Sequence, residues 1–188
     1  MLILASKSPR RAELLSKIGL QYRVLSADAD ETMDPLLPIE GEICRVSEKK
    51  ARAVAPLVSP EDVILAADTM VCVDGKRLGK PATPAAAAQM LQMLSGRSHS
   101  VVTGLCLLQG DQCETAAVTT KLQMRPISPE EIAAYVATGE PMDKAGAYGI
   151  QGLASIFVES MEGDYYNVMG LPLCQLSRML PAFGIQVL

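Results

Sequence analysis

Two adjacent arginines occupy the start of a predicted helix, where acidic side chains would suit the backbone better. Ser8 is typical of the residue that caps a helix, Pro9 of its first position, and Gly19 of its end. Arg10 and Arg11 then fall in the first turn, where unpaired backbone N–H groups and the helix dipole already create positive charge. Each arginine should destabilise the helix there by roughly 0.3–1 kcal/mol. This arrangement favours an anion site, and phosphate is the anion that it suits; the alternative is that both arginines pair with surface carboxylates.

Two later helix starts indicate that the chain uses ordinary capping elsewhere. Thr83 precedes a proline and neutral alanines, whereas Ser128 precedes a proline and has Glu131 at the spacing of a capping box. The first helix is therefore the exception, and anion binding would offset its cost. On this interpretation, Arg11→Ala weakens anion binding without lowering the stability of the ligand-free protein.

Further polar residues could take part in phosphoryl chemistry. Asp68 ends the apolar run VILAAD, and α/β sheets present ligand-facing groups at the ends of their strands. Glu31 lies in the acidic loop 28–35, while Lys50 and Lys80 could supply positive charge. Taken singly, each has a simpler explanation: a turn cap for Asp68 and solvated surface charge for the others. Together they offer cations for phosphates and carboxylates for a hard divalent ion.

Several familiar motifs are excluded. The run GKRLGKP has three residues between its glycines and no Ser or Thr after its second lysine, so it is not a P-loop. The spacing of Gly146, Gly149 and Gly152 does not match a dinucleotide-binding fingerprint. The chain's one histidine, His99, excludes a His-rich zinc site, and we expect it to be an ordinary hydrogen-bonded residue at the start of a strand.

The elements that position these residues alternate between strands and helices. Strands are predicted at 2–5, 21–27, 63–68, 99–109, 115–124 and 154–161. Helices are predicted at 9–18, 40–57, 84–95, 129–138 and 172–180. This succession predicts an α/β fold with a mixed sheet and flanking helices. With no long polar linker and no repeat, we expect a single domain over residues 1–188.

Composition narrows the function classes. Aromatic residues make up 4% of the chain, tryptophan is absent and the net charge is −4, so neither a nucleic acid polymer nor another polyanion is an expected partner. No apolar run approaches the length of a membrane span and the start does not resemble a secretory signal, so we expect a cytoplasmic protein without membrane contact. The five scattered cysteines lie in apolar runs and are expected to be reduced core thiols.

The segment 139–152, GEPMDKAGAYGIQG, holds four glycines in fourteen residues, interleaved with Asp, Lys, Tyr and Gln. Such a composition suits a backbone that approaches a ligand closely while a few side chains read it. This segment, with SxSPRR, AADTxV, LGKP, LSGRSHSVVT and GDYYNVMGLP, closely resembles the Maf family of nucleoside triphosphate pyrophosphatases. The motifs occur in order over about residues 2–173.

The resemblance implies a fold related to the inosine-triphosphate pyrophosphatases, with two lobes around a nucleotide cleft. It implies hydrolysis of a nucleoside triphosphate to the monophosphate and pyrophosphate with a divalent cation, Mg²⁺ or Mn²⁺. The family's phosphate-binding serine and arginines fall on Ser8, Arg10 and Arg11. Its two catalytic lysines, in a helix and in LGKP, fall on Lys50 and Lys80.

The acidic residues of the family can also be placed. Asp68 of AADT corresponds to the proton acceptor, and the acidic residue after the second strand falls on Glu31, with Asp30 as the adjacent alternative. Glu31 and Asp68 would hold the metal together with phosphate oxygens. Gln151 of GAYGIQG is expected to read the base.

Three positions indicate the subfamily. Arg10, Thr69 and Gln151 match the branch that acts on dTTP and UTP, and modified uridine triphosphates would suit a house-cleaning role. The alternatives are a nucleotide-binding regulator of septum formation without turnover and a purine-directed pyrophosphatase of the same fold. The oligomeric state stays open, with a homodimer as one alternative.

Overall fold

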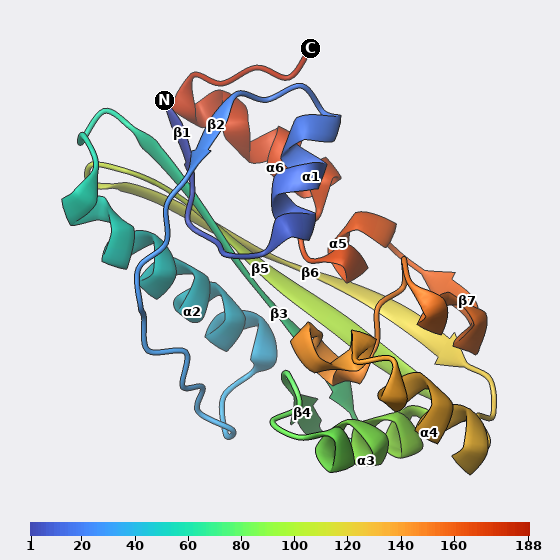
Figure 1. Cartoon of the computed structure of the whole chain (residues 1–188). Helices are drawn as coiled ribbons and strands as arrows, with labels where there is room; N and C mark the ends of the chain where they lie inside the picture. The colour runs from blue at the N-terminus through green and yellow to red at the C-terminus, as the bar shows by residue number, and fades with distance from the viewer. The chain divides into compact units, whose positions relative to one another are not determined.

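The apolar runs of the sequence become the strands of one mixed sheet (Figure 1). The computed structural model describes residues 1–188, and the sheet has seven strands in the order β2-β1-β3-β5-β6-β7, with β4 paired to β3. Pairing is parallel between β1 and its neighbours β2 and β3, and antiparallel for β3 with β4 and for β6 with β7. The predicted α/β fold with a mixed sheet is therefore confirmed.

The regular elements follow the predicted order. The strands are β1 (Leu2–Leu4), β2 (Tyr22–Val24), β3 (Val63–Val73), β4 (Lys76–Leu78), β5 (Ser98–Gln109), β6 (Gln112–Met124) and β7 (Val158–Glu162). The α-helices are α1 (Pro9–Lys17), α2 (Ile39–Val54), α3 (Pro84–Leu94), α4 (Pro129–Ala137), α5 (Tyr165–Met169) and α6 (Leu173–Met179). Short 3₁₀ helices are η1 (Ala55–Leu57), η2 (Glu140–Asp143), η3 (Ala145–Ala147), η4 (Leu153–Phe157) and η5 (Leu180–Phe183).

Several predicted elements differ from those observed. The strand expected to end at Asp68 continues to Val73, because its last residues pair with β4, so Asp68 lies within β3 and not at its end. The strand expected at 21–27 is only three residues long, because it pairs with the equally short β1 at the edge of the sheet. The strand expected at 154–161 begins as η4, since Ala154 and Phe157 are buried at helical rather than alternating spacing. The helix expected at 40–57 gives way to η1, where Pro56 cannot donate a helical hydrogen bond.

The chain forms two compact units that interleave along the sequence. Unit 1 comprises residues 1–68, 103–118 and 170–188, and unit 2 comprises residues 69–102 and 119–169. The chain therefore passes from one unit to the other within β3, β5 and β6.

In unit 1, helices cover both faces of the strands, with α2 on one side and α1 and α6 on the other (Figure 1). Because side chains alternate along a strand, each face carries its own set of buried residues. The face toward α2 is formed by Ile3, Ala5, Ile64, Ala66, Cys106 and Leu108, packed with Ala51 and Val54. This packing holds α2, which carries Lys50, against the part of β3 that leads to Asp68.

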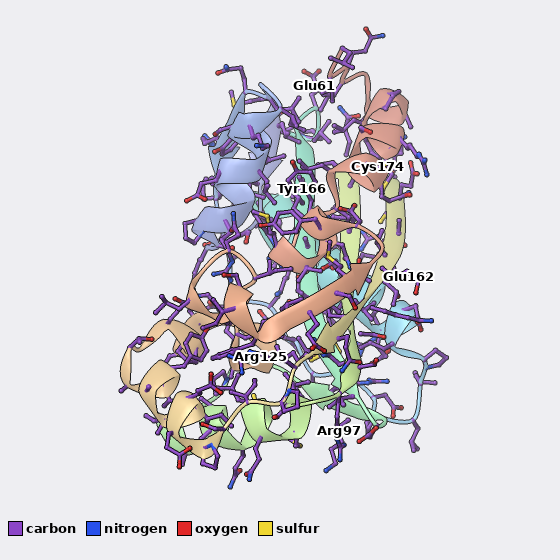
Figure 2. All side chains as sticks on the ribbon, turned by 90° about the vertical axis from the view of Figure 1, so that its right-hand side faces the viewer. Glu61, Arg97, Arg125, Glu162, Tyr166 and Cys174 are labelled. Atoms are coloured by element: carbon purple, nitrogen blue, oxygen red, sulfur yellow. The ribbon has the colours of Figure 1, made fainter.

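Unit 2 has a separate apolar core between its strands and α3 and α4. Its buried members include Val71, Leu91, Leu94, Val101, Leu122, Ile132, Tyr135, Tyr148 and Phe157. Arg125, labelled in Figure 2, lies with its guanidinium carbon 5.1 Å from the centre of the Phe157 ring and forms an ion pair with Glu131 at 2.7 Å. Arg125 thus links the end of β6 to the first turn of α4.

Candidate active site

The start of α1 differs from the other two helix starts as the sequence predicts. The side chains of Thr83 and Ser128 each accept a hydrogen bond from the backbone of their own helix, and Ser128 and Glu131 complete a capping box. Ser8 occupies the same N-cap position with Pro9 after it, but its side chain makes no capping bond. The first turn of α1 therefore lacks both a side-chain cap and an acidic residue.

Arg11 has structural partners that the sequence did not indicate. Its Nε donates to the carbonyl oxygen of Gly170 at 2.7 Å, and its Nη1 donates to Ser6 Oγ at 3.2 Å. Burial lowers the pKa of Arg11, Arg10 lowers it too, and the nearby Asp68 carboxylate opposes both. These two hydrogen bonds of the folded chain argue against the expectation that Arg11→Ala leaves the stability of the ligand-free protein unchanged, because the substitution removes both.

Lys50 joins the two acidic residues that the sequence singled out. Its Nζ lies 2.6 Å from Asp68 Oδ1 and 3.0 Å from Glu31 Oε1. The Lys50 and Asp68 side chains are each 14% exposed, whereas Glu31 is 61% exposed. The Glu31–Lys50–Asp68 cluster thus has two fixed, mostly buried members and one that faces solvent.

The acidic loop presents Glu31, rather than Asp30, to this cluster. Asp30 Oδ2 forms an ion pair with Lys49 at 2.7 Å, and Asp30 Oδ1 accepts a hydrogen bond from the backbone N–H of Thr32 at 3.0 Å. The Lys49 and Thr32 hydrogen bonds lower the pKa of Asp30. Since Asp30 is engaged by Lys49, Glu31 is the loop carboxylate that reaches Lys50.

An ion pair on α2 between the buried Glu42 and the partly exposed Arg45 anchors the same loop, and the sequence analysis missed it. The carboxylate of Glu42 accepts from Arg45 Nε at 2.8 Å and from the backbone N–H of Asp34 at 2.5 Å. Arg45 Nη2 also donates to the carbonyl oxygen of Thr32 at 2.9 Å. The hydrogen bond to Glu42 raises the pKa of Arg45. The spacing of Glu42 and Arg45 on one helix face was the available signal.

The other predicted site residues belong to unit 2. Thr69 is half-buried on β3, and Lys80 and Gln151 are exposed. The loop that carries Lys80 contacts the glycine-rich segment, because the backbone N–H of Gly146 donates to the carbonyl oxygen of Gly79 at 3.0 Å. Unit 2 therefore brings the LGKP loop and the segment that carries Gln151 together.

Two glycines of the segment 139–152 are required for a reason other than the one the sequence suggested. A Cβ on Gly146 would lie 2.8 Å from Val71 Cγ2, and one on Gly152 would lie 2.1 Å from Glu140 Oε1. Gly146 also has a φ of +67°. At these positions the space beside the backbone is taken by the protein's own side chains rather than kept open for a ligand.

His99 behaves as the sequence predicts. It is buried at the start of β5, and its Nε2 lies 2.7 Å from the hydroxyl of the buried Tyr148, which belongs to the glycine-rich segment. Burial lowers the pKa of His99 to about 4, so the imidazole is neutral at pH 7.

No group of three or more His, Cys, Asp or Glu side chains gathers as a metal site. The two predicted ligands, Glu31 and Asp68, do lie around one ammonium group, and their carboxylate oxygens are the donors that Mg²⁺ and Mn²⁺ prefer.

None of the helices combines the length and apolar character that crossing a membrane requires. The prediction of core thiols is right for Cys106, which is buried, and wrong for Cys174, which is exposed on α6.

The fold is similar to that of a solved structure of low sequence identity. "The structure of the Staphylococcus aureus Ham1 protein" matches with a TM-score of 0.56 and 14% identity over 96% of this chain and 98% of that one. This likeness shows the class of fold, an α/β fold of the Ham1 type. The chain itself belongs to the Maf family, because the protein-family model described as "Maf-like protein" matches residues 1–183.

Relatives of high identity cover nearly the whole chain. A protein named "dTTP/UTP pyrophosphatase" from Exiguobacterium sibiricum is 49% identical over 98% of this chain and 93% of its own length. Proteins of the same name from Symbiobacterium thermophilum and Moorella thermoacetica are 50% and 48% identical, each over 99% of this chain and at least 95% of their own length.

Proposed function

We propose that this protein hydrolyses dTTP and UTP to the monophosphate and pyrophosphate, and accepts modified uridine triphosphates as well. The relatives that carry this activity in their names match along almost the full length of the chain. The observation that carries the proposal is the Glu31–Lys50–Asp68 cluster, which combines two carboxylates and one cation within hydrogen-bond distance. Such a cluster suits hydrolysis of a charged phosphoanhydride better than simple retention of a nucleotide.

Basic residues supply the binding of the triphosphate. The first turn of α1 offers backbone N–H groups, the Ser8 hydroxyl and the guanidinium groups of Arg10 and Arg11 to phosphate oxygens. The exposed ammonium group of Lys80 adds a further cation. This role explains why two arginines occupy a helix start that would otherwise favour acidic side chains.

The carboxylates of the cluster fit a divalent cation. Glu31 and Asp68 would hold Mg²⁺ or Mn²⁺ together with phosphate oxygens, because hard cations prefer oxygen ligands. The bound ion would neutralise charge on the triphosphate and polarise the α-phosphoryl group. The ion pairs of Lys50 with both carboxylates support a role for its ammonium group beside the same phosphates.

Asp68 carries the proton chemistry in this proposal. Lys50 orients the Asp68 carboxylate through Oδ1, and that carboxylate accepts a proton from the attacking water or orients it. Pyrophosphate then leaves from the α-phosphorus. Lys50 belongs to the catalytic machinery because it contacts Asp68 and faces the charge that develops on the phosphates.

Thr69 and Gln151 would recognise the base. Thr69 and Gln151 occupy the specificity positions of the pyrimidine branch, and the Gln151 amide can both donate and accept hydrogen bonds. Uracil and thymine present the same O2, N3–H and O4 edge, so one glutamine side chain can form hydrogen bonds with either base. This shared edge is the reason for proposing dual use of UTP and dTTP.

The experiment is a panel of the eight common ribo- and deoxyribonucleoside triphosphates with Mg²⁺ or Mn²⁺. Phosphate is measured with and without added inorganic pyrophosphatase. The proposal expects phosphate only when that enzyme is added, and mainly from dTTP and UTP. Preferential use of purine nucleotides would refute the assigned substrate, and UTP binding without turnover of any nucleotide would favour a regulator.

A further inference from the structure

The turn that carries Gln151 is held in place by an acidic residue of η2, in the orange part of the chain that follows α4 (Figure 1). Glu140 is half-buried, and both of its carboxylate oxygens accept hydrogen bonds within unit 2. Tyr135 Oη donates to Oε1 at 3.0 Å, and the backbone N–H of Leu153 donates to Oε2 at 3.1 Å. The Leu153 bond reaches the chain two residues after Gln151.

The Glu140 carboxylate is itself fixed on the core. Tyr135 is 4% exposed, and its ring packs edge-on against Phe157 with the ring centres 5.5 Å apart. A buried aromatic ring of this kind has little freedom, so the phenol that donates to Glu140 stays in place. The carboxylate therefore acts as a link between the core of unit 2 and the exposed turn.

The two glycines around Gln151 lie directly against side chains held by this link. A Cβ on Gly152 would come within 2.1 Å of Glu140 Oε1, and one on Gly149 would come within 2.5 Å of Lys144 Cε. Lys144 Nζ donates to the carbonyl oxygen of Glu140 at 2.9 Å and forms an ion pair with Asp143 at 2.6 Å. The backbone on either side of Gln151 thus packs on two anchored side chains.

We propose that Glu140 is the positioning residue that fixes Gln151 for recognition of a pyrimidine base, an inference that rests on the proposed function. A side chain discriminates between bases only when its hydrogen-bonding groups are held in one geometry. Exposed turns move easily unless their backbone is tied down. Glu140 provides that tie without contacting the nucleotide, so it acts on binding and specificity rather than on the chemical step.

The test compares Glu140→Ala with Glu140→Gln. Alanine removes both acceptors, and it leaves the Leu153 N–H without this partner. Glutamine fills the same space: its carbonyl oxygen can accept from Leu153 while its amide donates to the Tyr135 oxygen. Glu61→Ala serves as the matched control, because it removes an exposed glutamate side chain in unit 1.

For Glu140→Ala we expect KM for UTP to rise about tenfold, as the loss of one good hydrogen-bonded contact implies, while kcat stays within about twofold. The ratio of kcat/KM for UTP to that for GTP should fall about tenfold. Glu140→Gln and Glu61→Ala should both keep the wild-type values. A purely structural role of Glu140 would not produce this separation of KM from kcat.

Amide hydrogen exchange without nucleotide supplies a second, independent result. Exchange at Gln151 to Leu153 should accelerate in Glu140→Ala and stay at the wild-type rate in Glu140→Gln. Unchanged exchange in the alanine variant, or an equal loss of activity toward UTP and GTP, overturns the inference. A wild-type protein that hydrolyses neither UTP nor dTTP refutes the proposed function instead, and the exchange rates still decide whether Glu140 holds the turn.

Discussion

Replacing Arg11 by alanine should destabilise the ligand-free protein as well as weaken nucleotide binding. The substitution removes the bonds from Arg11 to the Gly170 carbonyl at 2.7 Å and to Ser6 Oγ at 3.2 Å. Hydrogen bonds from a charged group contribute about 1.5–3 kcal/mol each, and the second is long enough to count for less. Removing a cation from the first turn of α1 stabilises the helix by about 0.3–1 kcal/mol, which offsets part of this loss. The expected net loss is therefore about 2–4 kcal/mol.

The assay is thermal unfolding of the protein without nucleotide or metal, followed by titration with UTP. For a chain of 188 residues, each kcal/mol lowers Tm by about 2–4 °C, so Arg11→Ala should unfold roughly 5–15 °C below the wild type. Arg10→Ala is the matched control, because it removes the same side chain from the neighbouring position and leaves both Arg11 bonds in place. Its Tm should fall by less than that of Arg11→Ala, while its UTP affinity falls.

The unfolding temperatures and UTP affinities of Arg11→Ala and Arg10→Ala together separate the structural role of Arg11 from phosphate binding. An Arg11→Ala protein that unfolds within about 2 °C of the wild type would refute the structural role of the Gly170 and Ser6 bonds. A large loss of stability in Arg10→Ala alone would show that the stabilising role belongs to Arg10 and not to Arg11. Unchanged UTP affinity in both variants would remove the first turn of α1 from the phosphate site.

Three further predictions concern other parts of the molecule. Asp68→Asn should abolish pyrophosphate release while UTP binding measured by calorimetry persists, and an active variant would remove Asp68 from the proton-accepting role. Gly152→Ala places a Cβ 2.1 Å from Glu140 Oε1, so it should raise KM for UTP as Glu140→Ala does; a variant with wild-type KM would show that the turn accommodates the methyl group without loss. The pKa of His99, about 4 in the fold against about 6.5 unfolded, means that its contribution to stability is present above pH 6.5 and is lost as the pH falls to about 4. The free energy of unfolding, measured with denaturant, should therefore fall less between pH 7 and pH 5 in His99→Gln than in the wild type. Equal falls in the two proteins would contradict a buried neutral imidazole.

Features set by neighbouring residues were predictable from the sequence. The starts of α1, α3 and α4 depend on a capping residue and a proline next to it, and all three begin where the sequence indicated. The unusual first turn of α1 was also recognisable, because two basic residues oppose the helix dipole wherever the helix packs.

Features that depend on contacts between distant residues were predictable only in part. Resemblance to the Maf family singled out Glu31, Lys50 and Asp68, but not that one ammonium group touches both carboxylates. The bond between Arg11 and Gly170 joins residues 159 positions apart, and no local pattern indicates it. Packing decides such contacts, and packing is a property of the whole fold.

The glycine-rich segment shows how a correct signal can have an unexpected cause. Four glycines in fourteen residues indicated a backbone that approaches another group closely, and Gly146, Gly149 and Gly152 are crowded in the structure. The crowding at Gly152 comes from Glu140, whose position depends on Tyr135 in the core of unit 2. Sequence spacing could not distinguish a side chain of the protein from a bound ligand as the cause.

The central claim is cleavage of a pyrimidine nucleoside triphosphate between its α- and β-phosphates, and its most direct test is the identity of the products from UTP. The purified protein is incubated with UTP and Mg²⁺, and the products are resolved by phosphorus NMR over the time course. We expect UMP and pyrophosphate in equal amounts, with no UDP at any time and no products from Asp68→Asn. UDP with orthophosphate, or UTP that binds and stays intact, would contradict it.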